Sequence, residues 1–160
     1  KDTQDILKND ILAVTSVLIK SIGPLFSAEE YTILRNNLKQ MDSISRQIKY
    51  KYIMAIKGNH QILINNMDLC MQQIKMLMST GLLNSFTRKS ESDESPYFWC
   101  LGANRTFNQF KNANINNTNE TDKIIMNCEI FIESILKIAE IIVPGSREEH
   151  NQALSRVLGK

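Results

Sequence analysis

The sequence predicts an all-α protein that folds as one domain, residues 1–160, in a bundle of about five to six helices. Two observations predict this class. Apolar residues recur at helical spacing through most of the chain, and residues 122–143 are apolar around more than half of a helix circumference. Other helices must cover such a helix, so we expect it at the centre of the bundle.

The central helix, 122–143, carries two neighbouring apolar stripes. The first falls at i, i+4, i+7, i+11, i+14 and i+18: Ile124, Cys128, Phe131, Ile135, Ile138 and Ile142. The second consists of Ile125, Ile132, Leu136, Ala139 and Val143. Few positions remain for polar side chains, which is typical of a helix with partners on several sides.

Three further helical elements are expected in the first half of the chain. The first spans Asp2 to Ile22 and ends at Gly23 and Pro24, because proline cannot continue a helix. Ser27 and Glu30 form a capping box that opens a second helix to about Met41. Apolar spacing then continues in nearly one phase across 44–78, which favours one long kinked helix, although Gly58-Asn59 is also typical of a break between two.

We expect a long irregular loop over about 82–121. Its residues 87–95 are polar without periodicity, and Tyr97 to Leu101 follow as an apolar cluster that should fold back as a lid or short strand. Phe107 and Phe110 suggest a helical turn or two before an asparagine-rich stretch. After the central helix, a capping box at Ser146 predicts a short last helix.

Composition limits the classes of function. The net charge is +2, from 19 basic and 17 acidic residues, so nucleic acid is not the expected partner. Charged residues interrupt the most apolar segment, so no transmembrane segment is expected. The pattern does not indicate an oligomeric state.

No enzyme, metal or cofactor site is expected. The chain lacks the phosphate-binding, dinucleotide-binding, zinc-protease and calcium-loop motifs. His60 and Cys70 would lie roughly 15 Å apart along one helix, beyond proton-transfer reach. Glu148, Glu149 and His150 are adjacent and point in different directions on a helix, so they do not form a metal site. We expect a neutral His60 that hydrogen-bonds a backbone carbonyl freed at the kink.

The three cysteines, Cys70, Cys100 and Cys128, leave two interpretations. Cys70 and Cys128 lie on apolar stripes and are typical of small buried residues. A disulfide between two of the three is the alternative, with Cys100 and Cys128 as candidates because Cys100 falls in the expected loop.

The first functional hypothesis is a non-enzymatic module that binds a protein partner. The contact would be a helix face or the aromatic cluster Tyr97, Phe98 and Trp99, since recognition residues are commonly carried on loops held by a rigid scaffold.

Two alternatives remain open. A carrier of a lipid or other small hydrophobic molecule would use the methionine-rich segment, the central helix and the lid formed by Tyr97 to Leu101. Its candidate residues are Met67, Met71, Met78, Phe131 and Ile135. Binding of an anionic polymer would use the basic segment 35–57, and its candidate residues are Arg46, Lys49, Lys51 and Lys57.

Three glycosylation sequons begin at Asn104, Asn116 and Asn119. They cluster in the expected loop, and the chain starts at Lys1 without a methionine, as in a processed mature protein or an excised piece. Both features favour a secreted or extracellular protein.

Overall fold

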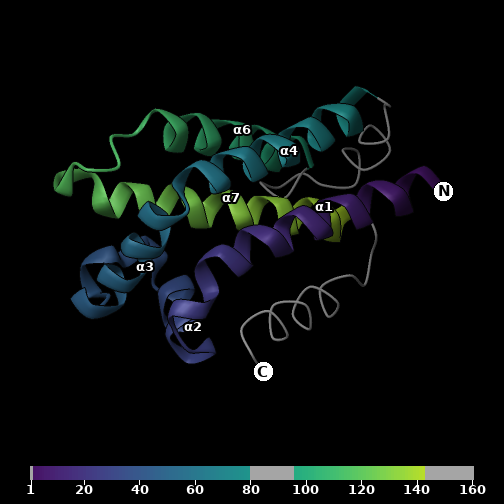
Figure 1. The fold of residues 1–160 in the computed structure, drawn as a ribbon. Coiled ribbons are helices and arrows are strands. Elements are labelled where there is room, and N and C mark those ends of the chain that lie inside the picture. The colour runs from purple at the N-terminus through teal and green to yellow at the C-terminus, as the bar shows by residue number, and fades with distance from the viewer. Residues whose placement is uncertain (1, 80–95, 143–160) are drawn as a thin grey trace.

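A computed structural model describes residues 2–79 and 96–142, and helices are the regular structure in these ranges (Figure 1). The α-helices are α1 (Asp2–Ile22), α2 (Ala28–Asn36), α3 (Arg46–Gly58), α4 (His60–Ser79), α6 (Pro96–Asn112) and α7 (Thr121–Ile142). Short 3-10 helices are η1 (Gly23–Leu25), η2 (Leu38–Ser43) and η3 (Thr118–Glu120). No strand occurs in the described ranges, and the predicted all-α class is confirmed.

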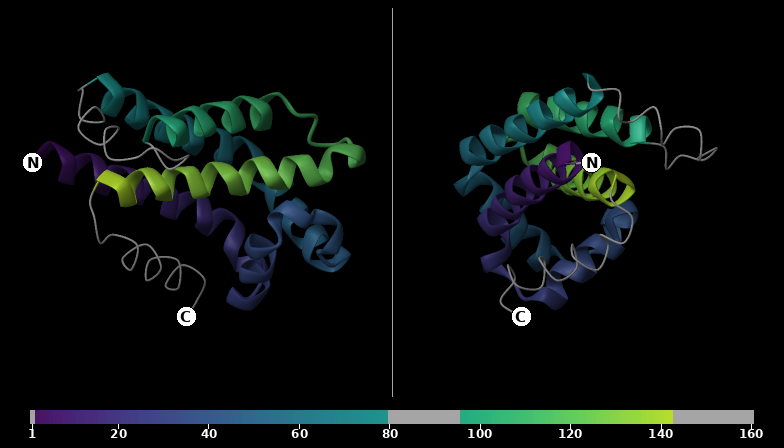
Figure 2. Two further views of the ribbon diagram at one scale, coloured as in Figure 1. Left: turned by 180° about the vertical axis from the view of Figure 1, so that it is seen from behind. Right: turned by 90° about the vertical axis from the view of Figure 1, so that its right-hand side faces the viewer.

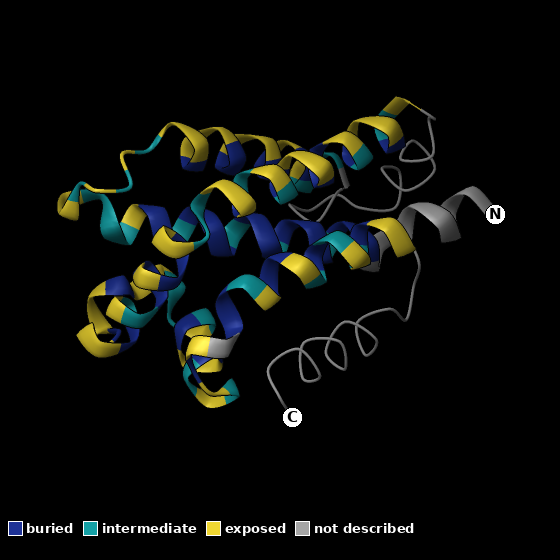
Figure 3. Ribbon diagram, in the orientation of Figure 1, coloured by how far each residue is buried: buried dark blue, intermediate teal, exposed yellow. Residues whose placement is uncertain are grey.

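The long helices α1, α4, α6 and α7 form the bundle, and α2, η2 and α3 gather at one end of it (Figures 1 and 2). α7 packs most extensively on α6 and also contacts α1, α3 and η2. Buried residues follow α7 along most of its length (Figure 3). The predicted central hydrophobic helix is therefore confirmed. No helix in the described part combines the length and apolarity needed to cross a membrane.

The first two helix boundaries follow the local signals in the sequence. α1 ends at Ile22, and Gly23–Leu25 form a single 3-10 turn with its proline at the start. The Ser27 hydroxyl accepts from the Glu30 amide at 3.1 Å, and the Glu30 carboxylate accepts from the Ser27 amide at 3.3 Å. This is the predicted capping box.

The second helix is shorter than predicted. α2 ends at Asn36 instead of near Met41. Asn37 has backbone angles of φ −111° and ψ 18°, and its side-chain amide donates to the Ile33 carbonyl at 2.8 Å. Asparagine competes in this way for backbone groups that would otherwise stay in the helix. The chain continues as η2, where Gln40 is again non-helical at φ −120° and ψ 59°.

The expected single kinked helix over 44–78 is wrong, because α3 and α4 are separate helices that meet at Asn59. The Asn59 side-chain amide donates to the carbonyls of Ala55 and Ser21, both at 2.9 Å. Asn59 therefore makes the bond to a freed backbone carbonyl that we expected His60 to make. Its second bond joins the break to the end of α1. His60 instead lies 5.3 Å from Phe110, ring centroid to ring centroid, and burial lowers its pKa.

The predicted irregular loop over 82–121 is wrong for most of its described part, because Pro96–Asn112 form α6. Tyr97 to Leu101 are the first turns of this helix and not a lid or strand. Proline suits the first turn, where its missing N–H would have no helical partner. The helical period appears once small residues are counted as core, through Cys100, Ala103, Phe107 and Phe110. Among the described residues of this range, 113–120 form an asparagine-rich connection that contains η3 and keeps the predicted irregular character.

Some sequence expectations concern residues outside the described ranges. These are the polar loop 87–95, the capping box at Ser146, the short last helix and the Glu148, Glu149 and His150 group.

Candidate functional site

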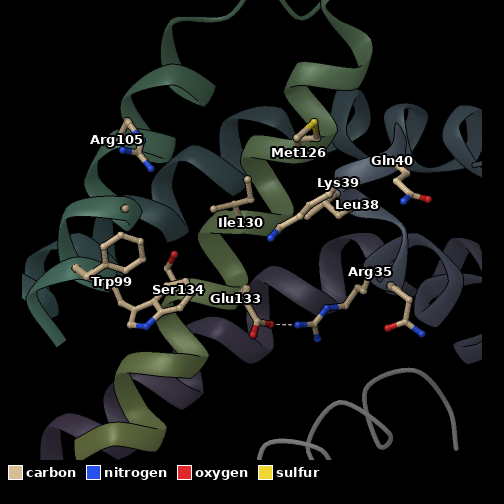
Figure 4. A pocket seen from close by; sticks show the side chains of 13 residues that line it. Arg35, Leu38, Lys39, Gln40, Trp99, Arg105, Met126, Ile130, Glu133 and Ser134 are labelled. Atoms are coloured by element: carbon tan, nitrogen blue, oxygen red, sulfur yellow. Dashed lines mark hydrogen bonds and ion pairs between the residues drawn. The ribbon is translucent and has the colours of Figure 1, made fainter. Parts of the chain in front are cut away.

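A groove of about 650 Å³ lies between the end of α2, η2, α6 and α7 (Figure 4). Residues from all four segments line it: Arg35, Asn36, Leu38, Lys39, Gln40, Phe98, Trp99, Gly102, Arg105, Met126, Ile130, Glu133 and Ser134. One wall exists because α2 stops at Asn36, so that Leu38, Lys39 and Gln40 depart from its helical path.

The walls of the groove are largely apolar. Met126 and Ile130 are one turn apart on α7, and Leu38 faces them from η2. Trp99 contributes the wall on α6, and its ring meets that of Phe98 edge to face at 5.3 Å. Leu38, Trp99 and Met126 are partly buried and pack against the core. The groove therefore offers an apolar surface held by rigid helices on two sides.

Gly102 of α6 and Ser134 of α7 are neighbours in the lining of the groove. A Cβ atom added at Gly102 would lie 3.6 Å from the Ser134 hydroxyl oxygen, an ordinary van der Waals contact. Ser134 is 0% exposed, and its hydroxyl has no hydrogen-bond partner in the described structure. The indole N–H of Trp99 is likewise buried without a partner. Two polar groups at this site thus have unused hydrogen-bonding capacity.

The charged side chains of the groove are mostly basic. The lining has three cationic side chains, Arg35, Lys39 and Arg105, and one carboxylate, Glu133. Its net charge is therefore +2. Arg35 forms an ion pair with Glu133, drawn as the dashed line in Figure 4. Within the described residues neither Lys39 nor Arg105 forms an ion pair. The net positive charge of the lining therefore rests on these two.

A buried polar cluster lies beside the groove, where side chains of α2 reach α7. The Tyr31 hydroxyl donates to Glu129 at 3.3 Å, and the Arg35 Nε lies 3.7 Å from the same carboxylate oxygen. The Arg35 guanidinium also lies 5.8 Å from the centre of the Tyr31 ring. Arg35 thus joins this cluster to the groove through its ion pair with Glu133.

The carboxyl group of Glu129 is strongly perturbed by its burial. Burial raises its pKa to about 7, although the Arg35 charge and the Tyr31 hydrogen bond act in the opposite direction. Burial, with the nearby Glu129, also raises the pKa of Tyr31 well above its usual value. Glu129 therefore holds its proton to a higher pH than a solvent-exposed glutamate does. Its position on a mostly apolar helix gave no sequence signal for this, since an isolated glutamate normally faces solvent.

Two of the three aromatic residues predicted to bind a partner line the groove. Phe98 is 44% exposed, Trp99 is partly buried, and Tyr97 packs partly buried against the core. Sequence reasoning found this cluster but missed the η2 wall, which depends on the early end of α2.

The residues predicted for a hydrophobic ligand do not line this groove. Met67, Met71, Phe131 and Ile135 are fully or almost fully buried in the core, and Met78 packs against it. α4 and α7 have the same main neighbours, α1 and α6. In the described part of the chain these side chains therefore belong to the core packing between α1, α4, α6 and α7.

Ion pairs partly neutralise the predicted basic patch. Lys49 lies 3.4 Å from Asp122, and Lys51 lies 3.3 Å from Glu30. Arg46 and Lys57 are exposed on α3. The basic segment is therefore divided between paired and exposed charges.

The sequons occupy two different environments. Asn116 and Asn119 are exposed in the connection between α6 and α7. Asn104 is also exposed, but it lies on α6 instead of in the expected loop. The hydroxyl of Thr106, in the same sequon, is buried and donates to the Gly102 carbonyl at 2.9 Å.

The three cysteines are buried free thiols in this structure. Burial raises the pKa of each to about 12, which keeps the thiols protonated near neutral pH. No group of three or more metal-binding side chains occurs among the described residues.

Comparison of the chain with protein-family models gave no match, and comparison with curated proteins and with solved structures gave none either.

Proposed function

We propose that this protein is a non-enzymatic binding protein that holds a small hydrophobic molecule in the groove between η2, α6 and α7. The supporting observation is the groove itself, whose volume of about 650 Å³ lies within the range usual for small-molecule sites. Apolar walls with a few polar groups are typical of such sites. The proposal takes up one of the two alternatives drawn from the sequence, a hydrophobic small molecule, and places it in the groove instead of the methionine-rich core.

Trp99 makes this proposal directly testable, because it is the only tryptophan and lies in the groove. Titration with dodecan-1-ol should change its fluorescence intensity and emission maximum in a saturable way. Ile130→Gln should weaken binding by placing an amide on the apolar wall. Ile62→Gln is the matched control, since Ile62 is exposed on α4 and does not line the groove. Unchanged fluorescence, with no heat of binding by calorimetry, would contradict the proposal.

A second candidate, binding of a protein that presents an apolar surface, is favoured by two exposed apolar side chains of α6, one of which also lines the groove. Phe98 and Leu101 are 44% and 64% exposed and one turn apart. Phe98→Ala and Leu101→Ala should then abolish crosslinking to a partner in native extracts, while Leu69→Ala, at an exposed position on α4, should not. Equal crosslinking by all variants would remove this candidate.

Binding of an anionic polymer through 35–57 has less support, because carboxylates already pair with Lys49 and Lys51.

We also propose secretion, supported by the exposed sequons. An intact mass that includes glycans at Asn116 or Asn119 would support it, and an unmodified mass from a natively produced sample would oppose it.

A further inference from the structure

We propose that the groove selects an anionic amphiphile, a single apolar chain that ends in a carboxylate. The chain would lie along Met126 and Ile130, and the carboxylate would meet Lys39 or Arg105. This inference rests on the proposed function and adds the chemical class of the ligand.

The first argument is charge complementarity. Lys39 extends from η2 toward Ile130, and Arg105 stands on α6 across the groove (Figure 4). Neither has an ion-pair partner within the described residues. A carboxylate next to an apolar wall can form charge-assisted hydrogen bonds with either cation, which are stronger than bonds between neutral groups. A cationic head group would be repelled by both.

Glu133 does not cancel this preference. Its carboxylate is held by Arg35, so the two charges compensate each other inside the lining. Arg35 is further occupied by Glu129, with Nε 3.7 Å from the carboxylate oxygen. Lys39 and Arg105 therefore supply the charge that is available to a ligand.

The second argument is the unused hydrogen-bonding capacity at the base of the groove. The Ser134 hydroxyl lies between Trp99 and Ile130 in Figure 4, and Ser134 is fully buried. Neither this hydroxyl nor the Trp99 indole N–H has a hydrogen-bond partner in the described structure. Both groups can donate, and the indole can only donate. An oxygen-bearing ligand supplies acceptors, whereas a plain hydrocarbon leaves both donors unpaired at a cost in free energy.

The test compares three probes of equal chain length below their micelle concentrations: dodecanoate, dodecan-1-ol and dodecylammonium. Dissociation constants come from Trp99 fluorescence and are checked by calorimetry. We expect dodecanoate to bind at least about tenfold more tightly than dodecan-1-ol, because one charge-assisted contact contributes on the order of a tenfold factor. Dodecylammonium should bind most weakly.

A pair of double variants shows whether the groove cations cause the preference. Lys39→Gln with Arg105→Gln should bring the affinities for dodecanoate and dodecan-1-ol close together. Arg46→Gln with Lys57→Gln removes the same net charge from exposed positions on α3 that do not line the groove, and should leave the preference intact. An equal loss in both double variants would assign the preference to overall charge and overturn the inference.

The remaining outcomes separate this inference from the proposed function. Equal affinities of the unmodified protein for dodecanoate and dodecan-1-ol would overturn the inference and leave a groove for neutral ligands. Failure of all three probes to bind would overturn both. Sedimentation could also show a dimer that one of the probes dissociates. A second copy of this chain would then be the natural occupant of the groove, and the inference would be overturned.

Discussion

Two apolar regions of this molecule, the packed core around Met67 and Phe131 (the packed region) and the groove, differ in how tightly their side chains pack. The packed region contains Met67, Met71, Phe131 and Ile135, all 0–4% exposed. Leu38, Trp99, Met126 and Ile130 in the groove are partly buried around a hollow. Long helices surround the packed region, whereas the irregular segment after Asn36 forms one wall of the groove. Apolar composition alone therefore did not locate the groove, because the hollow depends on the early end of a helix.

The largest expected difference concerns thiol chemistry in the packed region. Cys70 and Cys128 are 0% exposed, and burial raises the pKa of each to about 12. The thiolate fraction at pH 8 should be lower than in the unfolded chain by about three orders of magnitude, so labelling by iodoacetamide should be correspondingly slow. Time-resolved mass spectrometry measures this rate.

The same labelling after unfolding in urea counts the thiols. Three labels are expected if all cysteines are free, as in this structure. One label would instead show that a disulfide, such as Cys100 with Cys128, had formed. Fast labelling of the native protein would mean that the packed region opens readily.

Truncation of one methionine in each region tests the comparison directly. Met67→Ala should lower the free energy of unfolding by about 2–5 kcal/mol, because it leaves a cavity among fixed neighbours. Met126→Ala should cost about 1 kcal/mol or less, because Met126 is only partly buried and already faces a hollow. Urea denaturation measures both values. Equal losses would show that the groove wall is packed as tightly as the core.

The polar cluster beside the groove should make folding stability depend on pH. The folded pKa of Glu129 is about 7, raised from an ordinary value of 4.5, so the folded protein binds more protons than the unfolded chain between these values. The free energy of unfolding should therefore fall as pH rises from about 4.5 to about 7, by on the order of 3 kcal/mol. Urea denaturation across this range measures the slope.

Glu129→Gln shows how much of the pH dependence of stability comes from Glu129, because the amide does not titrate and can still accept from Tyr31. The variant should show a flatter dependence between pH 5 and 8. Glu120→Gln is a suitable control, since Glu120 lies in η3 and belongs to neither the groove nor the cluster. A slope that persists in Glu129→Gln would show that other groups titrate with folding.

The smallest expected effect concerns the base of the groove. Ser134→Ala removes a buried hydroxyl that has no partner, so it should leave the ligand-free protein unchanged or stabilise it by up to about 1 kcal/mol. It should also weaken dodecanoate binding, because one donor is lost. Thermal unfolding and the fluorescence titration measure the two effects. Marked destabilisation of the ligand-free variant would mean that the hydroxyl is already satisfied in solution.

Much of the fold could be predicted because its signals are local. Ser27 and Glu30 are three residues apart and form the capping box by themselves. The apolar period of α7 predicted its burial on several sides. α6 was missed because its core face includes Cys100 and Ala103, small residues next to a conspicuous aromatic cluster. The site was found only in part, through Phe98 and Trp99, since no local pattern places η2 opposite them.

The sequence by itself determined the helical class, the central position of α7 and the ends of helices at proline, glycine and capping residues, because these depend on neighbours along the chain. Tertiary structure alone decided that Asn59 divides α3 from α4 by bonding to Ser21, and that Glu129 and Ser134 are buried on a helix where polar side chains normally face water. It also decided the groove. Burial and hollows arise from the elements that meet in space, and contacts between residues as distant as Arg35 and Glu133 are not encoded in any single stretch of sequence.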